Sequence, residues 1–282
     1  MLSKILKQDL KSFLPLWLFF SAIALGASTL LGPSLNMVIY YNHATVLVLG
    51  VLGFTLSVAV LSGYLGATVV FVGIRFYQNF YTDEGYLTFT LPVKRSTLYL
   101  SKVLSGSIFV FSSLAVVIAS ACCALLFVPT SSTNSAPVLF RVLDFLWNVF
   151  ELAFSNIPDN VTLILCFVVC VLIFIALEIF EVLTLYLCIT VGSVIAKKLK
   201  VLVSIVCYYA VNTVIGIASS IGQIFLTSYA YELIMIIKEM PIKLVGVAIL
   251  LVLVCVLGFM IALTSLIYYI TNRLIERRLN LP

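Results

Sequence analysis

Charged residues are scarce in this sequence. Only 10% of its 282 residues are Asp, Glu, Lys or Arg, whereas 63% are hydrophobic. A soluble domain carries about 25% charged residues, so this chain cannot cover a water-facing surface and the lipid bilayer is its expected solvent. The net charge of +5 comes from basic residues spread among short connections. Because these residues form no patch, the charge does not indicate a nucleic-acid-binding protein.

Motifs for catalysis and metal binding are lacking as well. The sequence contains no GxxxxGK[ST], GxSxG or HExxH motif, and its one histidine is His43. Its seven cysteines lie inside apolar runs without a CxxC pair. We therefore expect them to be small buried hydrophobic residues and not disulfides or metal ligands. We expect no catalytic residue, no metal site and no cofactor bound by this chain, which is not an enzyme by itself.

Six long apolar runs are the main feature that is present. A membrane helix needs about 20 predominantly apolar residues, so the sequence predicts an all-α polytopic membrane protein with a single transmembrane domain over residues 1–282. The expected spans are 14–31, 44–75, 99–128, 161–195, 201–228 and 245–270. As one helix, the second run would be about 48 Å long, against a hydrocarbon core of about 30 Å. We expect this run and the fourth run, which is also too long, to tilt or to project into the cytoplasm.

The basic residues predict the orientation of the chain. With both termini in the cytoplasm, all 16 Lys and Arg residues except Arg141, Lys238 and Lys243 belong to the cytoplasmic side. Cytoplasmic loops of membrane proteins carry an excess of Lys and Arg. The sequence therefore predicts six transmembrane helices with an N-in/C-in topology.

Three further segments are expected at the membrane surfaces. Residues 1–12 place their leucines and Ile5 on one helical face with lysines opposite, which predicts an amphipathic interfacial helix. In the extracellular segment 129–160, the polar residues of 138–154 follow one narrow stripe, so this helix is expected to lie flat on the outer leaflet or to pack over the bundle. The stretch YAYELIMIIKEMP resembles a short outer, re-entrant helix that Pro241 stops.

Two acids and one polar stripe lie inside the expected spans. Glu178 and Glu181 share a helix face, and an ionised carboxylate at mid-bilayer costs about 2.5–3.5 kcal/mol. They either line a translocation path or couple protons, or they lie near the cytoplasmic boundary, hydrated or paired. In the fifth span, small and polar residues recur every three or four positions: Ser204, Tyr208, Asn212, Gly216, Ser219, Gln223 and Thr227. Such a stripe indicates a helix–helix contact, within the bundle or between two copies, or a substrate path.

Three stretches carry a resemblance to a known family. The loop RFYQNFYTDEGYLTFTLPVKRSTLYLSKVLSG, residues 75–106, resembles the first cytoplasmic loop of bacterial ABC exporter permeases of the type-2 class. It combines an aromatic-rich stretch, an acidic-Gly-Tyr-Leu core, Leu-Pro, and a basic pair before Ser-Lys. The stretches LYLCITVGSVIAKKLKVLVSIVCYYAVNTV and NRLIERRLNL are also similar to that family.

The resemblance implies a permease subunit in a bacterial plasma membrane. It implies a cytoplasmic ABC ATPase as a separate chain, which binds ATP and Mg²⁺, and a second permease, either an identical copy or a related chain. It also implies that the cytoplasmic loop 76–98 forms the coupling helix that docks on this ATPase. That role falls on Asp83, Glu84, Gly85, Tyr86, Leu87 and Pro92. Thr82 and Asp83 are suitable N-caps, and acids are favourable at a helix N-terminus.

The sequence is compatible with three classes of function. The first is an ATP-driven exporter of an amphipathic or hydrophobic cargo, such as a peptide, toxin, drug or lipid, because most spans lack the charges that a small hydrophilic ion requires. The second is a proton- or ion-coupled secondary transporter that uses Glu178 and Glu181. The third is a membrane-embedded assembly or sensor subunit without transport activity.

Overall fold

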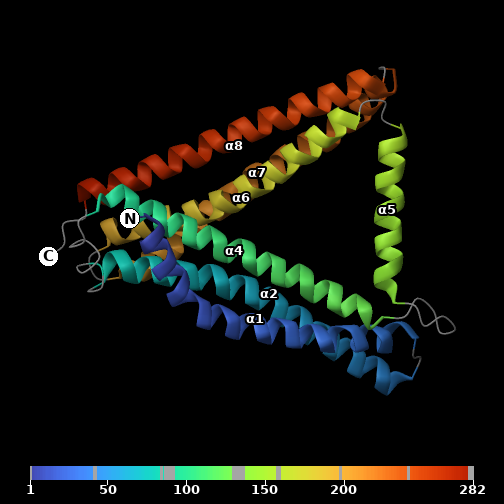
Figure 1. Cartoon of the computed structure of the whole chain (residues 1–282), viewed down its shortest axis with the longest axis horizontal. Helices are drawn as coiled ribbons and strands as arrows, with labels where there is room; N and C mark the ends of the chain where they lie inside the picture. The colour runs from blue at the N-terminus through green and yellow to red at the C-terminus, as the bar shows by residue number, and fades with distance from the viewer. Residues whose placement is uncertain are drawn as a thin grey trace. The chain divides into compact units, whose positions relative to one another are not determined.

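The computed structural model of the chain describes residues 2–40, 43–82, 85, 93–128, 137–156, 160–196, 199–239 and 242–278. These residues are almost entirely helical, and no strand occurs among them. The helices, coloured along the chain in Figure 1, are α1 (Leu2–Tyr40), α2 (Ala44–Tyr81), α4 (Arg95–Leu126), α5 (Val138–Asn156), α6 (Asn160–Ile195), α7 (Lys200–Glu239) and α8 (Ile242–Arg278).

Within the described residues, six helices are long and apolar enough to cross a membrane: α1, α2, α4, α6, α7 and α8. This confirms the expected all-helical class and the expected number of candidate spans. The helices are longer than the apolar runs. The 38 residues of α2 correspond to about 57 Å, nearly twice the thickness of a hydrocarbon core. Helix α5 is not among the six.

Two segments expected as separate helices are instead continuous with the spans beside them. Residues 2–12 form the first turns of α1, which continues through Pro15 and Pro33. A proline inside a helix removes one backbone hydrogen bond and bends the helix, and Figure 1 shows α1 bending towards its N-terminal end. The segment that begins at Tyr229, which was expected on the outer side, continues α7, which ends at Glu239, just before Pro241. No proline or glycine occurs between Tyr229 and Glu239 to stop α7 earlier, whereas Pro15 bends α1 without ending it.

The chain divides into two compact units, of which the first comprises Met1–Ile74 and Leu100–Leu152. In this unit α1 contacts α2 and α4. The Phe13 ring stacks on Phe109 of α4, with 4.7 Å between ring centroids, and meets Phe71 of α2 edge-on at 5.1 Å. The Ser21 and Tyr64 hydroxyl groups lie 3.1 Å apart and share a hydrogen bond. Residues in the first half of α1 contact residues in the second half of α2, so these two helices are antiparallel.

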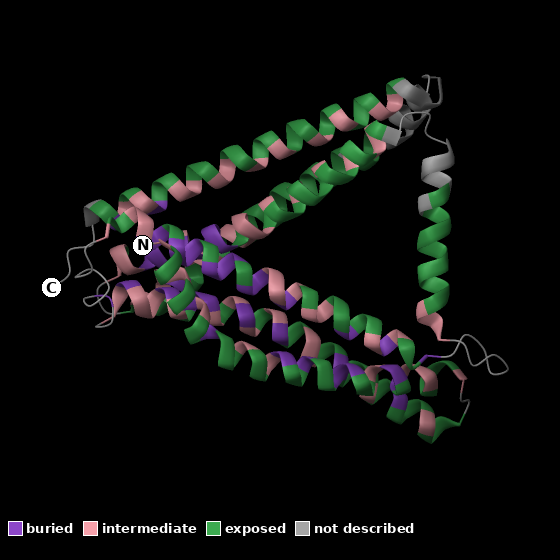
Figure 2. Ribbon diagram, viewed as in Figure 1, coloured by how far each residue is buried: buried purple, intermediate pink, exposed green. Residues whose placement is uncertain are grey.

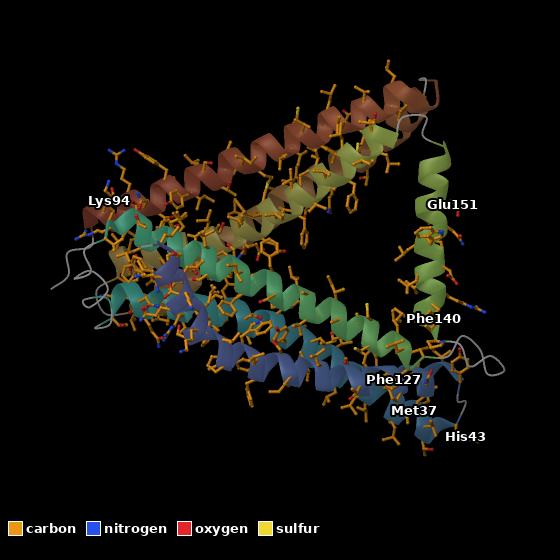
Figure 3. The ribbon with its side chains drawn as sticks, viewed as in Figure 1. Met37, His43, Lys94, Phe127, Phe140 and Glu151 are labelled. Carbon is orange, nitrogen blue, oxygen red and sulfur yellow. The ribbon has the colours of Figure 1, made fainter. Side chains whose placement is uncertain are left out.

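The other end of α1 is held by close backbone contacts. A Cβ added at Gly32 would lie 2.6 Å from the Ala124 carbonyl oxygen, so only glycine fits beside α4 there. The Asn36 amide donates a hydrogen bond of 2.6 Å to the Phe127 carbonyl. Figure 3 labels Phe127 and Met37 in this region. These contacts place the end of α4 beside the end of α1.

The second unit comprises Arg75–Tyr99 and Ala153–Pro282, and in it α6 packs against α7 and α8. A Cβ at Gly192 of α6 would lie 2.7 Å from the Ser204 Cα of α7, so the two backbones approach each other directly. Burial is concentrated in the last third of α6, from Val182 to Thr190. Figure 2 shows that most of α7 and α8 is exposed by contrast. The core of this unit therefore surrounds the residues that flank the loop between α2 and α4.

Candidate functional site

The candidate site is the connection between α2 and α4, together with the residues that hold its two ends. Helix α2 continues to Tyr81 and α4 starts at Arg95, so the connection is residues 82–94 and is shorter than the expected loop 76–98. Five of the residues expected to couple to an ATPase lie outside the described residues: Asp83, Glu84, Tyr86, Leu87 and Pro92.

Gly85 is the one expected coupling residue that the structure describes. It is buried, and its N–H donates a hydrogen bond of 2.8 Å to the Thr82 carbonyl. A Cβ at this position would lie 3.0 Å from the carbonyl carbon and oxygen of Phe80. A side chain here would therefore press on the final turn of α2, which explains a small residue at this point of the loop.

A cluster of aromatic rings lies at the two ends of this loop. We call it the aromatic base and define it as Phe76, Phe80, Tyr81, Tyr99, Tyr186 and Tyr268. The Phe76 and Tyr186 rings are stacked, with their centroids 3.9 Å apart. The Tyr99 and Tyr268 rings are stacked at 5.0 Å. The incoming end of the loop thus packs on α6, and the outgoing end packs on α8.

Hydrogen bonds also join the end of α2 to α6. The Tyr81 hydroxyl donates to the Thr190 hydroxyl at 3.0 Å, and Thr190 donates in turn to the Tyr186 carbonyl at 2.7 Å. Thr190 is completely buried. A hydrogen bond between buried groups fixes the position of both partners, because either one loses its bond if it moves. The last residue of α2 is therefore tied to α6.

The Lys94 backbone and the Arg95 side chain hold the other end of the loop. The Lys94 carbonyl accepts hydrogen bonds from the N–H groups of Thr97 and Leu98, at 2.9 and 3.2 Å, which starts the first turn of α4. The Arg95 guanidinium donates to the Glu276 carbonyl of α8 at 3.3 Å. The loop is thus anchored to α6 at its start and to α8 at its end.

The two acids expected within a span differ in exposure. Glu178, near the middle of α6, is half-buried, and Glu181 is exposed. Thr184 and Cys188, which continue the same sequence spacing, are buried, and the Thr184 hydroxyl donates to its own helix at Phe180. Neither carboxylate forms an ion pair with the residues that the structure describes. The two acids are therefore close along one helix but are not part of a paired buried site.

The polar stripe of α7 divides into two parts. Ser204 is buried against α6, and its hydroxyl donates to the Lys200 carbonyl at 2.8 Å. Tyr208 and Asn212 are half-buried. Further along, Gly216, Ser219, Gln223 and Thr227 are exposed. The first part is a contact within the bundle, whereas the second part remains uncovered in the described part of this unit.

The sequence did not reveal the charge pair between α1 and α4. The Lys102 ammonium lies 2.5 Å from Asp9 Oδ1, and the Ser101 hydroxyl donates to Asp9 Oδ2 at 2.9 Å. Asp9 lies seven residues after Leu2 and four after Ile5. These spacings place it on the apolar face of the expected interfacial helix, and that position is the signal that could have identified it.

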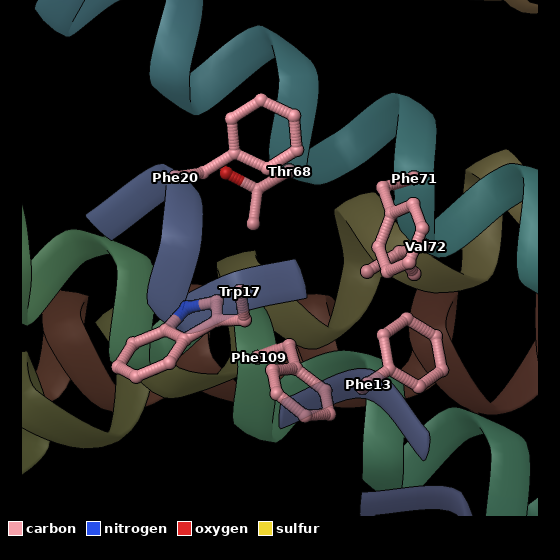
Figure 4. Close-up of a pocket in the computed structure, with 7 residues that line it drawn as sticks. All are labelled: Phe13, Trp17, Phe20, Thr68, Phe71, Val72 and Phe109. Atoms are coloured by element: carbon pink, nitrogen blue, oxygen red, sulfur yellow. The ribbon is translucent and has the colours of Figure 1, made fainter. Parts of the chain in front are cut away.

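The first unit also contains a small internal cavity of about 10 Å³. Figure 4 shows the side chains that line it: Phe13, Trp17, Phe20, Thr68, Phe71, Val72 and Phe109. A ligand site usually has a volume of about 300–1,000 Å³, so this cavity has no space for a transported molecule. In the described part of the chain, no three His, Cys, Asp or Glu side chains come together as potential metal ligands.

Comparison of the chain with protein-family models, with curated proteins and with solved structures found no match.

Proposed function

We propose that this chain is the permease subunit of an ATP-driven exporter of the type-2 ABC class, inserted in a bacterial plasma membrane with both termini in the cytoplasm. A separate ABC ATPase binds ATP and Mg²⁺ and docks on residues 82–94. Six candidate spans and the uneven distribution of Lys and Arg support this orientation. The similarity of residues 75–106 to the first cytoplasmic loop of such permeases suggests the class.

The anchoring of this loop is the observation that carries the proposal. The Phe76–Tyr186 stack and the Tyr81–Thr190 hydrogen bond join its start to α6, and Arg95 joins its end to α8. A force applied to the loop by a partner is transmitted to both helices, because packed and hydrogen-bonded side chains resist small displacements. A connection that served only to reverse the chain would not require this arrangement.

A second permease, identical or related, completes the transporter. The exposed half of the α7 stripe, with Ser219 and Gln223, supplies a surface for this contact. Small and polar residues let membrane helices approach closely and form hydrogen bonds across the interface. We propose an amphipathic or hydrophobic cargo, such as a peptide, toxin, drug or lipid, because the described spans expose mainly apolar side chains.

Charge reversal of the loop tests the proposal. The double variant Asp83→Lys/Glu84→Lys should insert normally in the membrane but should retain at least tenfold less ATPase subunit on purification in mild detergent. The matched control is Asp144→Lys/Glu151→Lys, which reverses two exposed charges on α5. Figure 3 labels Glu151, whose side chain extends outward from that helix. The control should bind the ATPase as the wild type does.

Two results would contradict the proposal. One is purification of the wild-type chain without any ATPase subunit, combined with vesicle transport that needs a proton gradient and no ATP. The other is unchanged ATP-coupled export by the Asp83→Lys/Glu84→Lys variant.

The half-buried carboxyl group of Glu178 favours one alternative, a proton- or ion-coupled secondary transporter. In that case Glu178→Gln should abolish transport, because the amide cannot carry a proton through the cycle. Under the exporter proposal, Glu178→Gln should retain ATP-driven export. The same vesicle assay with and without ATP distinguishes the two functions.

A further inference from the structure

A surface groove of the second unit lies between the last turns of α2 and the first turns of α7. Its volume is about 560 Å³, and it is lined by Tyr77 and by the α7 side of the chain at Leu199, Lys200, Val201, Leu202, Ile205 and Val206. Tyr77 and Lys200 are half-buried. The five aliphatic residues are each between 52% and 63% exposed. In its described lining the groove is therefore an open apolar surface with one cation, Lys200.

The chemistry of the groove changes along α7. Lys200 is the first residue of the helix, and Ile205 and Val206 lie about 8–9 Å further along it. The first N–H groups of a helix have no partner within the helix and favour a negative charge. The positive end of the groove thus combines an ammonium with the start of a long helix, while the rest of the α7 wall presents aliphatic side chains.

Contacts outside the groove hold Tyr77 in position. The Tyr77 ring stacks on Tyr81 with centroids 5.9 Å apart, and Tyr81 donates a hydrogen bond to the buried Thr190. On the α7 side, the Ser204 hydroxyl bonds the Lys200 carbonyl and so stabilises the first turn. A preformed site loses less conformational entropy when it binds a ligand.

We infer that this groove binds an anionic phospholipid. The phosphate lies at the Lys200 ammonium, and an acyl chain lies along Leu202, Ile205 and Val206. A negatively charged headgroup complements the cation, and a hydrocarbon chain complements the aliphatic wall. A soluble polar ligand would not complement the aliphatic wall. The inference rests on membrane insertion of the helices and is independent of the proposed ATPase partner.

Lipid retention by the full-length protein tests this inference. The protein is incubated with equal amounts of phosphatidylglycerol and phosphatidylcholine, and retained lipid is counted by native mass spectrometry. The wild type should retain about fivefold more phosphatidylglycerol, corresponding to the ~1 kcal/mol expected for one basic residue near a membrane surface. Lys200→Gln should abolish this preference, so that the two lipids are retained in about equal amounts. A photoreactive phosphatidylglycerol should crosslink to residues 199–206.

Two further variants make the test specific. Lys11→Gln removes an exposed lysine elsewhere and should leave the preference unchanged. Ile205→Trp fills the apolar part of the groove and should reduce crosslinking of residues 199–206 at least fivefold. Equal retention of the two lipids by the wild type, or equal losses in Lys11→Gln and Lys200→Gln, would overturn the inference. Because Lys200 is only half-buried, Lys200→Gln should fold, and it decides the outcome even if Ile205→Trp does not fold.

Discussion

Asp9 and Lys102, separated by 93 residues in the sequence, form an ion pair whose Oδ1 and Nζ atoms are 2.5 Å apart. The side chain of Lys102 is 7% exposed and that of Asp9 is 12% exposed. The pair fastens the N-terminal part of α1 to α4, close to the point where α4 leaves the candidate coupling loop.

Removal of one member of this pair should destabilise the first unit. Asp9→Asn removes the carboxylate that faces the buried Lys102 ammonium, and Lys102→Met removes the cation that faces the buried Asp9 carboxylate. Each should lower the free energy of unfolding by about 3–5 kcal/mol, measured by reversible denaturation in mixed micelles. The double variant Asp9→Asn/Lys102→Met should lose less than either single variant, since it removes both charges of the pair together. Lys11→Met, at an exposed lysine, is the control. Equal losses in the control would contradict this interpretation.

The close approach of α6 and α7 predicts a strict requirement for glycine at position 192. Gly192→Ala would place a Cβ 2.7 Å from the Ser204 Cα. Separation of the helices to relieve this clash should cost about 1–3 kcal/mol, visible as a lower midpoint of thermal unfolding. At Gly258 an added Cβ meets no atom within 4 Å. Gly258→Ala should therefore leave the midpoint unchanged or raise it, and a loss as large as that of Gly192→Ala would contradict the packing described.

The hydrogen bond from Tyr81 to Thr190 can be removed without loss of the ring. Tyr81→Phe should lower the free energy of unfolding by about 0.5–1.5 kcal/mol. If the proposed function is correct, it should also weaken ATP-driven export while the ATPase remains bound, because the end of α2 is then held on α6 by ring packing without this hydrogen bond. Tyr209→Phe, at a residue that is 68% exposed, serves as the control in both measurements. Full export by Tyr81→Phe would show that this bond does not transmit movement of the loop.

The Phe76–Tyr186 stack should be the main source of stability in the aromatic base. Phe76 is 1% exposed, so Phe76→Ala leaves a cavity and should cost about 3–5 kcal/mol. Phe76→Leu retains most of the apolar volume and should cost less. Phe19→Ala, at a residue that is 64% exposed, should have a small effect. Denaturation curves of the three variants test this order, and an equal cost for Phe76→Ala and Phe19→Ala would contradict it.

The candidate spans could be predicted from the sequence because each depends on a local property, a long run of apolar residues. The ends of the helices were harder to predict. Hydrophobicity decreases after Thr227, but nothing in the following residues prevents the backbone from continuing its hydrogen bonds, so α7 extends to Glu239. Residues 2–12 are also part of α1, because Pro15 bends this helix without ending it.

The candidate site was predicted only in part. The loop between the second and third spans was identified from its polar and aromatic composition, but the roles of Asp83 and Glu84 stay predictions. The stripe of α7 was expected to be one surface, whereas Ser204 is buried and Gln223 is exposed. The helical period shows which residues share a face, but it does not show how far a neighbouring helix covers that face.

The sequence by itself determined that the solvent of this protein is lipid and that its elements are helices. Backbone groups in a bilayer must be satisfied within the protein, and apolar runs of about 20 residues or more match the length of a spanning helix and not the shorter strands of a membrane barrel. Only the tertiary structure decided which scattered polar and aromatic groups meet: Asp9 with Lys102, Tyr81 with Thr190, and Phe76 with Tyr186. These contacts join residues about 90 to 110 positions apart. They depend on how whole helices pack, which no local pattern of residues specifies.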